Sequence, residues 1–228
     1  MPPGGLRVHL ETSLARFALV TVFVSTMTYG RTGDSCLGSP ELQKLAANGG
    51  DTQLSYPLRK SAYEQAIKLC PGQPSLYHSL AVLALQNHDF AGGLHLVRAG
   101  LRLWPDNPQL QLDEAVAFIS NGHPEDSLPI LAKLPGTAES QFYLGMAERA
   151  LGDQKATQHA LLKALHLGSQ DPYVLYVLIE QDHDLHDKEA GLRDFQTLVK
   201  RFPDSAWLHV VLGDAYMSRY KDSNAQSE

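Results

Sequence analysis

The chain has little of several features that would place it in a familiar functional class. It has only two cysteines in 228 residues, so at most one disulfide can form within it. No run of Lys or Arg occurs and the formal net charge is −6, which argues against a nucleic-acid partner. No Gly-x-Ser-x-Gly elbow occurs, and no phosphate-binding glycine loop follows a strand. The sequence therefore predicts no catalytic residues and no cofactor.

Long apolar runs are also missing, and the longest lies near the N-terminus. Arg7 and Arg16 precede an apolar stretch, Phe17–Val24, that fades towards Gly30. A membrane span needs about 20 apolar residues, whereas the core of a secretory signal needs about 7–15. Residues 1–30 are therefore predicted to be a cleaved signal peptide, with residues 31–39 as a linker. An uncleaved membrane anchor through residues 16–29 and an ordinary helix are the two alternatives.

A repeat organises the rest of the chain, and residues 75–108 show it best. Pro71 and Pro105 end successive segments and stand 34 residues apart. Pro203 lies 98 residues after Pro105, which is four short of three such periods. One intervening unit is therefore shortened, and the unit that begins at Pro108 is the one predicted to be short.

Each unit carries a small residue beside a leucine, as in Leu212-Gly213, Leu144-Gly145 and Leu80-Ala81. Small side chains at such a position let two helices approach closely. The period and this pattern, with Tyr216, Phe195, Ala164 and Pro203 at matching places, resemble the tetratricopeptide repeat family. The resemblance implies an all-α fold over residues 40–228. It would be a right-handed α-solenoid of antiparallel helix pairs, with about five to six repeats and an incomplete last one.

The punctuation of the chain predicts where several helices lie. In the first unit we expect helices over Pro40–Ala47 and Pro57–Cys70, joined by a turn at Gly49-Gly50-Asp51. In the third unit Pro129 should not lie deep in a helix, so the second helix is expected to start near Ser127 and to end before Pro135. The later units are expected at Ala138–Gln170, at Pro172–Pro203 and from Ser205 onwards.

In this family the first helix of each unit lines a concave groove that holds a protein or a peptide. The resemblance then assigns the groove to these residues: His78, Val82, Leu112, Val116, Phe142, Met146, Tyr173, Tyr176, Trp207 and Val210. The alternative is that several of them pack between helices. We favour the groove for Tyr173, Tyr176 and Phe142, because the interior is expected to be filled by Leu144, Leu175 and Leu178. Family members that clamp a C-terminal carboxylate use Lys and Asn at these places, so an apolar or aromatic peptide contact is expected here.

The most polar cluster, Asp182–Asp187, contains two histidines and three aspartates. Such residues can bind a divalent metal. The segment is predicted to be the turn between the two helices of the fifth unit, where solvated polar residues are ordinary. We therefore predict no metal site.

The two cysteines flank the first unit. Cys36 precedes its first helix and Cys70 ends its second, so an antiparallel hairpin brings the two together. A disulfide between them is predicted, provided that the chain is exported to an oxidising compartment. The alternative is two unpaired thiols in a cytosolic protein.

The sequence thus predicts a non-enzymatic, protein- or peptide-binding helical-repeat scaffold that is periplasmic or secreted. A membrane would be involved only if the N-terminal segment stays uncleaved. The competing hypothesis is a recruiting or regulatory module at the N-terminus of a longer enzyme or sensor that contains tetratricopeptide repeats.

Overall fold

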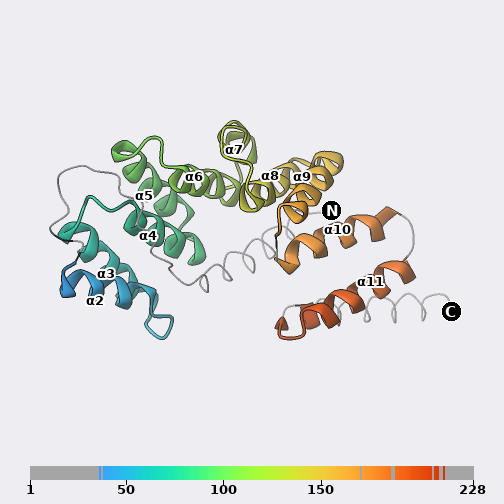
Figure 1. Ribbon diagram of the computed structural model, residues 1–228, viewed down its shortest axis with the longest axis horizontal. Helices are drawn as coiled ribbons and strands as arrows, with labels where there is room; N and C mark the ends of the chain where they lie inside the picture. Colours follow the sequence, from blue (N-terminus) through green and yellow to red (C-terminus); the bar gives the residue numbers. More distant parts are fainter. Residues whose placement is uncertain are drawn as a thin grey trace. The chain divides into compact units, whose positions relative to one another are not determined.

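The computed structural model describes residues 36, 38–169, 171–185, 188–206, 208–210 and 213 (Figure 1). Every regular element in this part of the chain is a helix, which confirms the all-α fold class. The chain divides into two compact parts, called unit 1 (Met1–Pro135) and unit 2 (Gly136–Glu228), which are described separately below. Each helix pair within them is called a repeat.

Unit 1 contains three helix pairs in chain order. They are α2 (Pro40–Gly50) with α3 (Tyr56–Leu69), α4 (Pro74–Gln86) with α5 (Phe90–Leu103), and α6 (Pro108–Ser120) with α7 (Pro124–Leu131). The two helices of each pair pack on one another, and α3 packs on α4 and α5 on α6. The first helices are also neighbours, since α4 contacts both α2 and α6. This neighbourhood gives the first helices a common face.

Unit 2 contains two helix pairs. They are α8 (Ala138–Leu151) with α9 (Gln154–His166), and α10 (Pro172–Leu185) with α11 (Lys188–Arg201). Each pair packs together, and α9 packs on α10. The order of contacts is the same as in unit 1, as expected when every pair repeats one pattern.

The helix starts are specified by short polar residues whose side chains accept a hydrogen bond from a backbone N–H three residues later. These caps are Ser39 to Leu42, Asp89 to Gly92, Asn107 to Leu110 and Asp153 to Ala156, at 2.9–3.1 Å. Each such cap is worth about 1 kcal/mol to its helix. The Pro-Asp-Asn and Gly-Asp motifs of the sequence thus set where helices begin as well as where they end.

Glycine allows the close approach of paired helices at two matching places. A Cβ on Gly93 of α5 would lie 2.7 Å from Leu85 of α4, and one on Gly145 of α8 would lie 2.7 Å from Leu161 of α9. Real Cβ atoms do not come so near another carbon, so a larger residue would require Leu85 or Leu161 to shift. Gly93 and Gly145 thus serve the packing of the two helices of a pair.

The turn predicted at Gly49-Gly50 is wrong, because both glycines belong to α2, which continues to Gly50. Gly49 packs under Tyr63 of α3, where a Cβ would lie 2.7 Å from ring carbons, and its carbonyl accepts a hydrogen bond from Arg59 Nε at 2.9 Å. These glycines serve contact between the two helices, and the helix ends at Asp51.

The start predicted for the second helix of the third repeat, near Ser127, is also wrong. This helix, α7, begins at Pro124, and Pro129 lies inside it. Pro124 stands in the first turn, where the missing N–H costs nothing. Pro129 comes only five residues later in a helix that ends at Leu131, so it removes a single hydrogen bond from a short element.

No helix among the described residues is both long and apolar enough to cross a membrane. Two predicted segments lie outside the described residues. They are the signal peptide or anchor, and most of the sixth repeat.

Candidate functional site

On the common face of the first helices in unit 1, the groove residue His78 contacts a carboxylate on the first helix of the next repeat. The Nδ1 of His78 in α4 lies 2.7 Å from Oδ2 of Asp113 in α6. The second oxygen, Oδ1, accepts a hydrogen bond from Gln109 Nε2 at 3.3 Å. Asp113 is only 5% exposed, whereas the side chain of His78 is 35% exposed.

This arrangement fixes the imidazole. A carboxylate only accepts hydrogen bonds, so Nδ1–H of His78 is the donor to Asp113. A buried carboxylate left without donors is costly, and two donors on one Asp113 remove that cost. The pair therefore ties α4 to α6 and holds the ring of His78 in one orientation at the surface.

Three apolar groove residues lie on the same two helices. Val82, one turn after His78 in α4, is half-buried, and Leu112 and Val116 of α6 are buried. A surface that combines an oriented imidazole with an aliphatic side chain can hold an apolar residue of a ligand.

In unit 2 the aromatic groove residues form a cluster. Phe142 of α8 packs edge-on against Tyr173 of α10, with ring centroids 6.1 Å apart, and Tyr173 stacks on Tyr176 at 5.5 Å. Phe142, Met146, Tyr173 and Tyr176 are all buried.

The burial in unit 2 reverses what the sequence suggested. Leu144, Leu175 and Leu178, which were expected to fill the interior, are only partly buried. The aromatic side chains are buried instead, since they pack on one another between α8 and α10. A role for Phe142 and Tyr176 in a ligand groove stays a prediction, and the argument from occupied interior places no longer supports it.

The structure says little about the other predicted groove residues and the predicted polar cluster. Val210 is 63% exposed, and Trp207 lies outside the described residues. The side chains of the Asp182–Asp187 cluster lie outside the description as well. Among the described residues, His123, Glu125 and Asp126 at the start of α7 have potential ligand atoms within 4.8 Å of one another, but all three are exposed. Acidic residues in a first turn are favoured by the helix dipole, which is sufficient reason for two of them.

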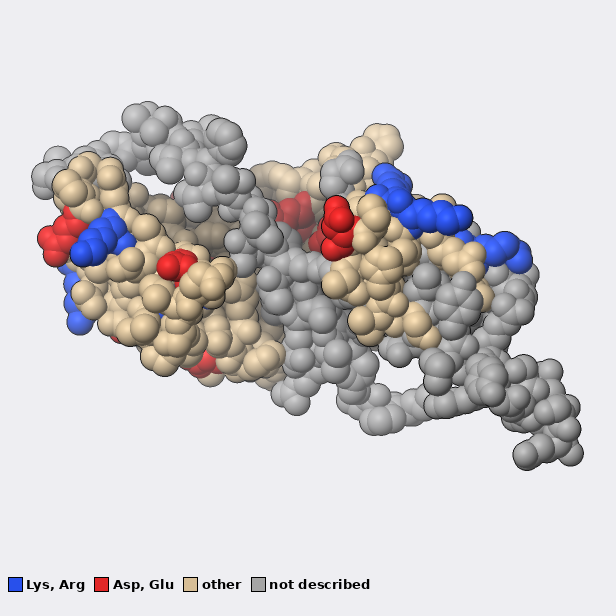
Figure 2. Space-filling view, turned by 90° about the horizontal axis from the view of Figure 1, so that it is seen from below, with Lys and Arg blue, Asp and Glu red and all other residues tan. Residues whose placement is uncertain are grey.

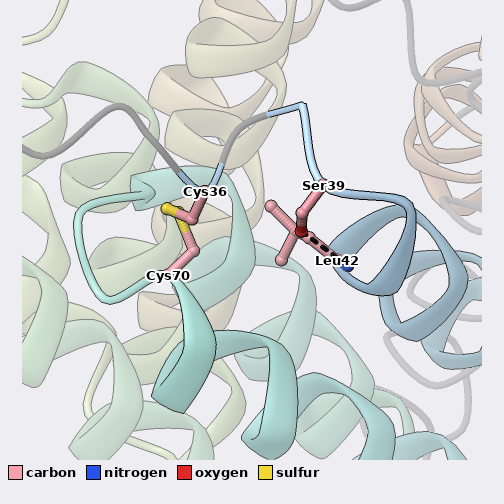
Figure 3. The surroundings of a disulfide bond; sticks show 4 residues. All are labelled: Cys36, Ser39, Leu42 and Cys70. Carbon is pink, nitrogen blue, oxygen red and sulfur yellow. Dashed lines mark hydrogen bonds between the residues drawn. A yellow bond between two sulfur atoms is a disulfide. The ribbon is translucent and has the colours of Figure 1, made fainter.

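The two cysteines form a disulfide in the structure, with Cα atoms 5.7 Å apart (Figure 3). It joins the segment before α2 to the end of α3, which is the pairing expected from the sequence. Ser39, which caps α2 through Leu42, also donates its backbone N–H to the carbonyl of Cys36 at 3.1 Å. The disulfide thus holds the segment before α2, and the cap stabilises the first turn of α2 itself.

In the described part of unit 1, the phenol of Tyr77 has a shifted pKa. Burial raises the pKa of the Tyr77 phenol above its ordinary value of 10.0. Tyr77 lies in the first helix of the second repeat, and its ring packs edge-on against Trp104 at 5.7 Å. This shift reflects core packing beside the groove face and marks no reactive group.

Asp113 is the residue that reasoning from the sequence missed. Its signal was present, since it stands 35 residues after His78, one period plus one. Residues at that separation lie on consecutive first helices and meet across them. Comparing His78 with the residue one period plus one later, on the next first helix, would have found the His–Asp contact.

The tetratricopeptide repeat family model matches residues 78–134. Among solved structures, a thermophilic tetratricopeptide repeat protein of Thermus thermophilus matches with a TM-score of 0.66 at 19% identity, over 77% of this chain and 99% of that one. A tetratricopeptide repeat protein from Parabacteroides merdae matches with a TM-score of 0.58 at 15% identity, over 83% and 77%.

MamA of Desulfovibrio magneticus matches with a TM-score of 0.57 at 12% identity, over 74% of this chain and 98% of that one. The comparison with curated proteins found no match. At these identities the structural likeness shows the fold alone. The family model matches residues 78–134, and the helix pairs described above share the fold of the solved tetratricopeptide repeat structures.

Proposed function

We propose that this protein is a non-catalytic scaffold that binds a protein segment on the first-helix face of unit 1. The observation that carries the proposal is the contact of His78 with the buried Asp113, which orients a partly exposed imidazole one turn before Val82 on α4. Tetratricopeptide repeats serve protein interaction in general, and the fold is shared here.

The chemistry of this face defines the kind of segment that fits. Val82 offers an aliphatic surface, and Asp113 holds the ring of His78 in place one turn before it on α4. The segment we expect has an apolar side chain that packs against Val82 and the imidazole ring. The Lys and Asn residues of a carboxylate clamp are absent from these positions, so a free C-terminus is not what the face selects.

The test is affinity capture from the source cell with the full chain, comparing a face variant with a matched control. Val82→Glu places a charge on the proposed face. Leu103→Glu places the same charge on α5, the second helix of the same repeat, where Leu103 is 50% exposed. We expect wild type and Leu103→Glu to retain the same partner, and Val82→Glu to lose it by about tenfold or more.

A partner retained equally by Val82→Glu would contradict the proposal. Circular dichroism and a melting curve for each variant establish that both are folded. His78→Ala should reduce capture of the partner by less than Val82→Glu does. It removes the oriented ring but leaves Gln109 as a donor to Asp113.

We also propose that the protein is exported to an oxidising compartment, periplasmic or extracellular. The Cys36–Cys70 disulfide supports this, since such bonds persist outside the reducing cytosol. Cell fractionation, followed by a thiol count on the unfolded and unreduced protein, tests it. Two free thiols in a cytosolic fraction would refute export.

A further inference from the structure

A separate surface lies on α9, the second helix of the first repeat of unit 2. Residues 155, 159, 162 and 166 are spaced so that they share one face of this helix. The opposite face carries the buried Thr157, Ala160, Leu161 and Ala164. The shared face is therefore the one turned to solvent, and it holds Lys155, His159, Leu162 and His166, with Lys163 at its edge.

The charge on α9 has one sign. The segment Gln154–His166 contains no Asp or Glu, although the chain as a whole has a net charge of −6. Neither Lys155 nor Lys163 forms an ion pair with any residue in the described part of the chain. The nearest acid in sequence, Asp153, caps the helix through the N–H of Ala156 at 2.9 Å. Figure 2 shows Lys and Arg in blue and Asp and Glu in red on one face of the molecule; the residues of the α9 surface are those named above.

Helix stability does not explain this pattern. Lys163 and His166 stand in the last turn, where positive charge is favourable. Lys155 stands in the first turn, where the helix dipole disfavours it, and no glutamate one turn away compensates. Its position thus costs the helix a little and calls for another role.

The apolar part of the face is Leu162, which is 51% exposed at its centre. Leu167, directly after the helix, is 43% exposed. Single exposed leucines are common on protein surfaces. Here the leucine is enclosed by basic and imidazole side chains on one helix face, which is the composition of a surface that holds an amphipathic, acidic helix.

We propose that the face of Lys155, His159, Leu162, Lys163 and His166 is a docking surface for an acidic helical segment of another protein. By the rise of a helix the stripe from Lys155 to His166 spans about 17 Å, or about three turns, which suits a helix laid along it. Glutamates on the segment pair with Lys155 and Lys163, and an apolar residue between them covers Leu162.

An anionic membrane is the less suitable occupant. Binding to acidic lipids takes clusters of about 4–8 Lys or Arg, and α9 has two. The net charge of −6 also repels a negative bilayer. This surface lies on a second helix and is independent of the first-helix face proposed above for unit 1.

The test uses the full chain and a fluorescein-labelled helical peptide of about 15 residues with glutamates flanking a leucine stripe. Binding is followed by fluorescence anisotropy. We expect Lys155→Glu/Lys163→Glu to weaken binding by about tenfold or more, since it turns two attractions into repulsions. Leu162→Ala should weaken it by about fivefold, for lost apolar contact.

The matched control is Lys44→Glu/Lys133→Glu, which makes the same charge change at two exposed lysines of unit 1. It should alter affinity by less than about twofold at physiological salt, where distant charges are screened. A peptide with lysines in place of the glutamates should not bind. Circular dichroism checks that each variant is folded, which is expected because all the substituted residues are exposed.

Four binding results, and one result on self-association, would overturn the proposal. The first three are no saturable binding of the acidic peptide, an equal loss of affinity in the control variant, and binding of the lysine peptide. The fourth is that the chain binds vesicles of phosphatidylcholine with about 30% phosphatidylglycerol through α9, and does not bind the peptide. Sedimentation velocity covers a second copy of this chain: a dimer abolished by Lys155→Glu/Lys163→Glu would assign the face to self-association and would also overturn it.

Discussion

The first and second repeats of unit 1 are held together by different means. In the first, α2 buries only Leu42 and Gly49, and α3 buries only Ala62 and Ala66. In the second, α4 alone buries seven residues, four of them leucines. The first repeat adds the Cys36–Cys70 disulfide, which the second lacks. A repeat with few large buried side chains is thus the one that carries the covalent link.

The position of the disulfide gives this difference a physical reason. Cys70 is buried in a small cluster with Leu42, Ala66 and Leu76, and Cys36 packs against it. Stability in a solenoid comes from each repeat and its contacts with its neighbours. Where a repeat buries few large side chains, a bond that restricts its unfolded chain replaces part of the missing apolar burial.

The largest expected effect comes from removing the disulfide. Cys36→Ser/Cys70→Ser opens a link with a sequence separation of 34 residues. We expect the free energy of unfolding of unit 1 to fall by about 3–4 kcal/mol, which is the loop-closure estimate for this length. Urea unfolding followed by circular dichroism measures it. Reducing agent should lower the stability of wild type to that of the variant and leave the variant unchanged; no difference between oxidised wild type and the variant would break the comparison.

A similar but slightly smaller effect is expected in the second repeat from Leu80→Ala. Leu80 is 1% exposed and sits at the centre of the α4 core. The cavity and the lost burial should cost about 3 kcal/mol by the same urea measurement. Leu58→Ala in α3, where the leucine is 58% exposed, is the matched control and should change stability by less than about 0.5 kcal/mol. Equal losses would mean that apolar burial does not distinguish the two repeats.

The smallest effect is expected from the cap of the first repeat. Ser39→Ala removes the hydrogen bond to the N–H of Leu42 and should cost about 1 kcal/mol. Ser75→Ala, at an exposed first-turn serine of α4 for which no capping bond is found among the described residues, is the control. A cost for Ser75→Ala as large as for Ser39→Ala would show that the two starts are equivalent and would weaken the contrast.

Periodicity was sufficient to predict the fold, because the small residues and prolines that define each repeat act locally. The Leu80-Ala81 and Leu144-Gly145 pairs, the helix pairs and the packing of Gly93 all follow from spacing along the chain. The two errors, at Gly49 and at Pro129, have a common cause. Both residues were read by their usual backbone preference, whereas contact with Tyr63 and the brevity of α7 decide what happens there.

The candidate site was less predictable because it depends on contacts between repeats. Which of Phe142 and Leu144 is buried depends on aromatic packing against Tyr173 of the next repeat. The partner of His78 is likewise on the next first helix. The sequence pattern predicts which residues occupy groove positions. Whether their side chains are exposed depends on contacts with side chains of the adjacent repeat.

The most direct test of the difference between the two repeats is native-state hydrogen exchange on the same protein with the disulfide intact and after reduction. The account predicts that reduction speeds exchange of backbone amides in α2 and α3 by several hundredfold, since about 3–4 kcal/mol is lost locally. The amides of α4 should change little, because leucine packing holds them. Equal acceleration in α2, α3 and α4, or no acceleration in any of them, would contradict it.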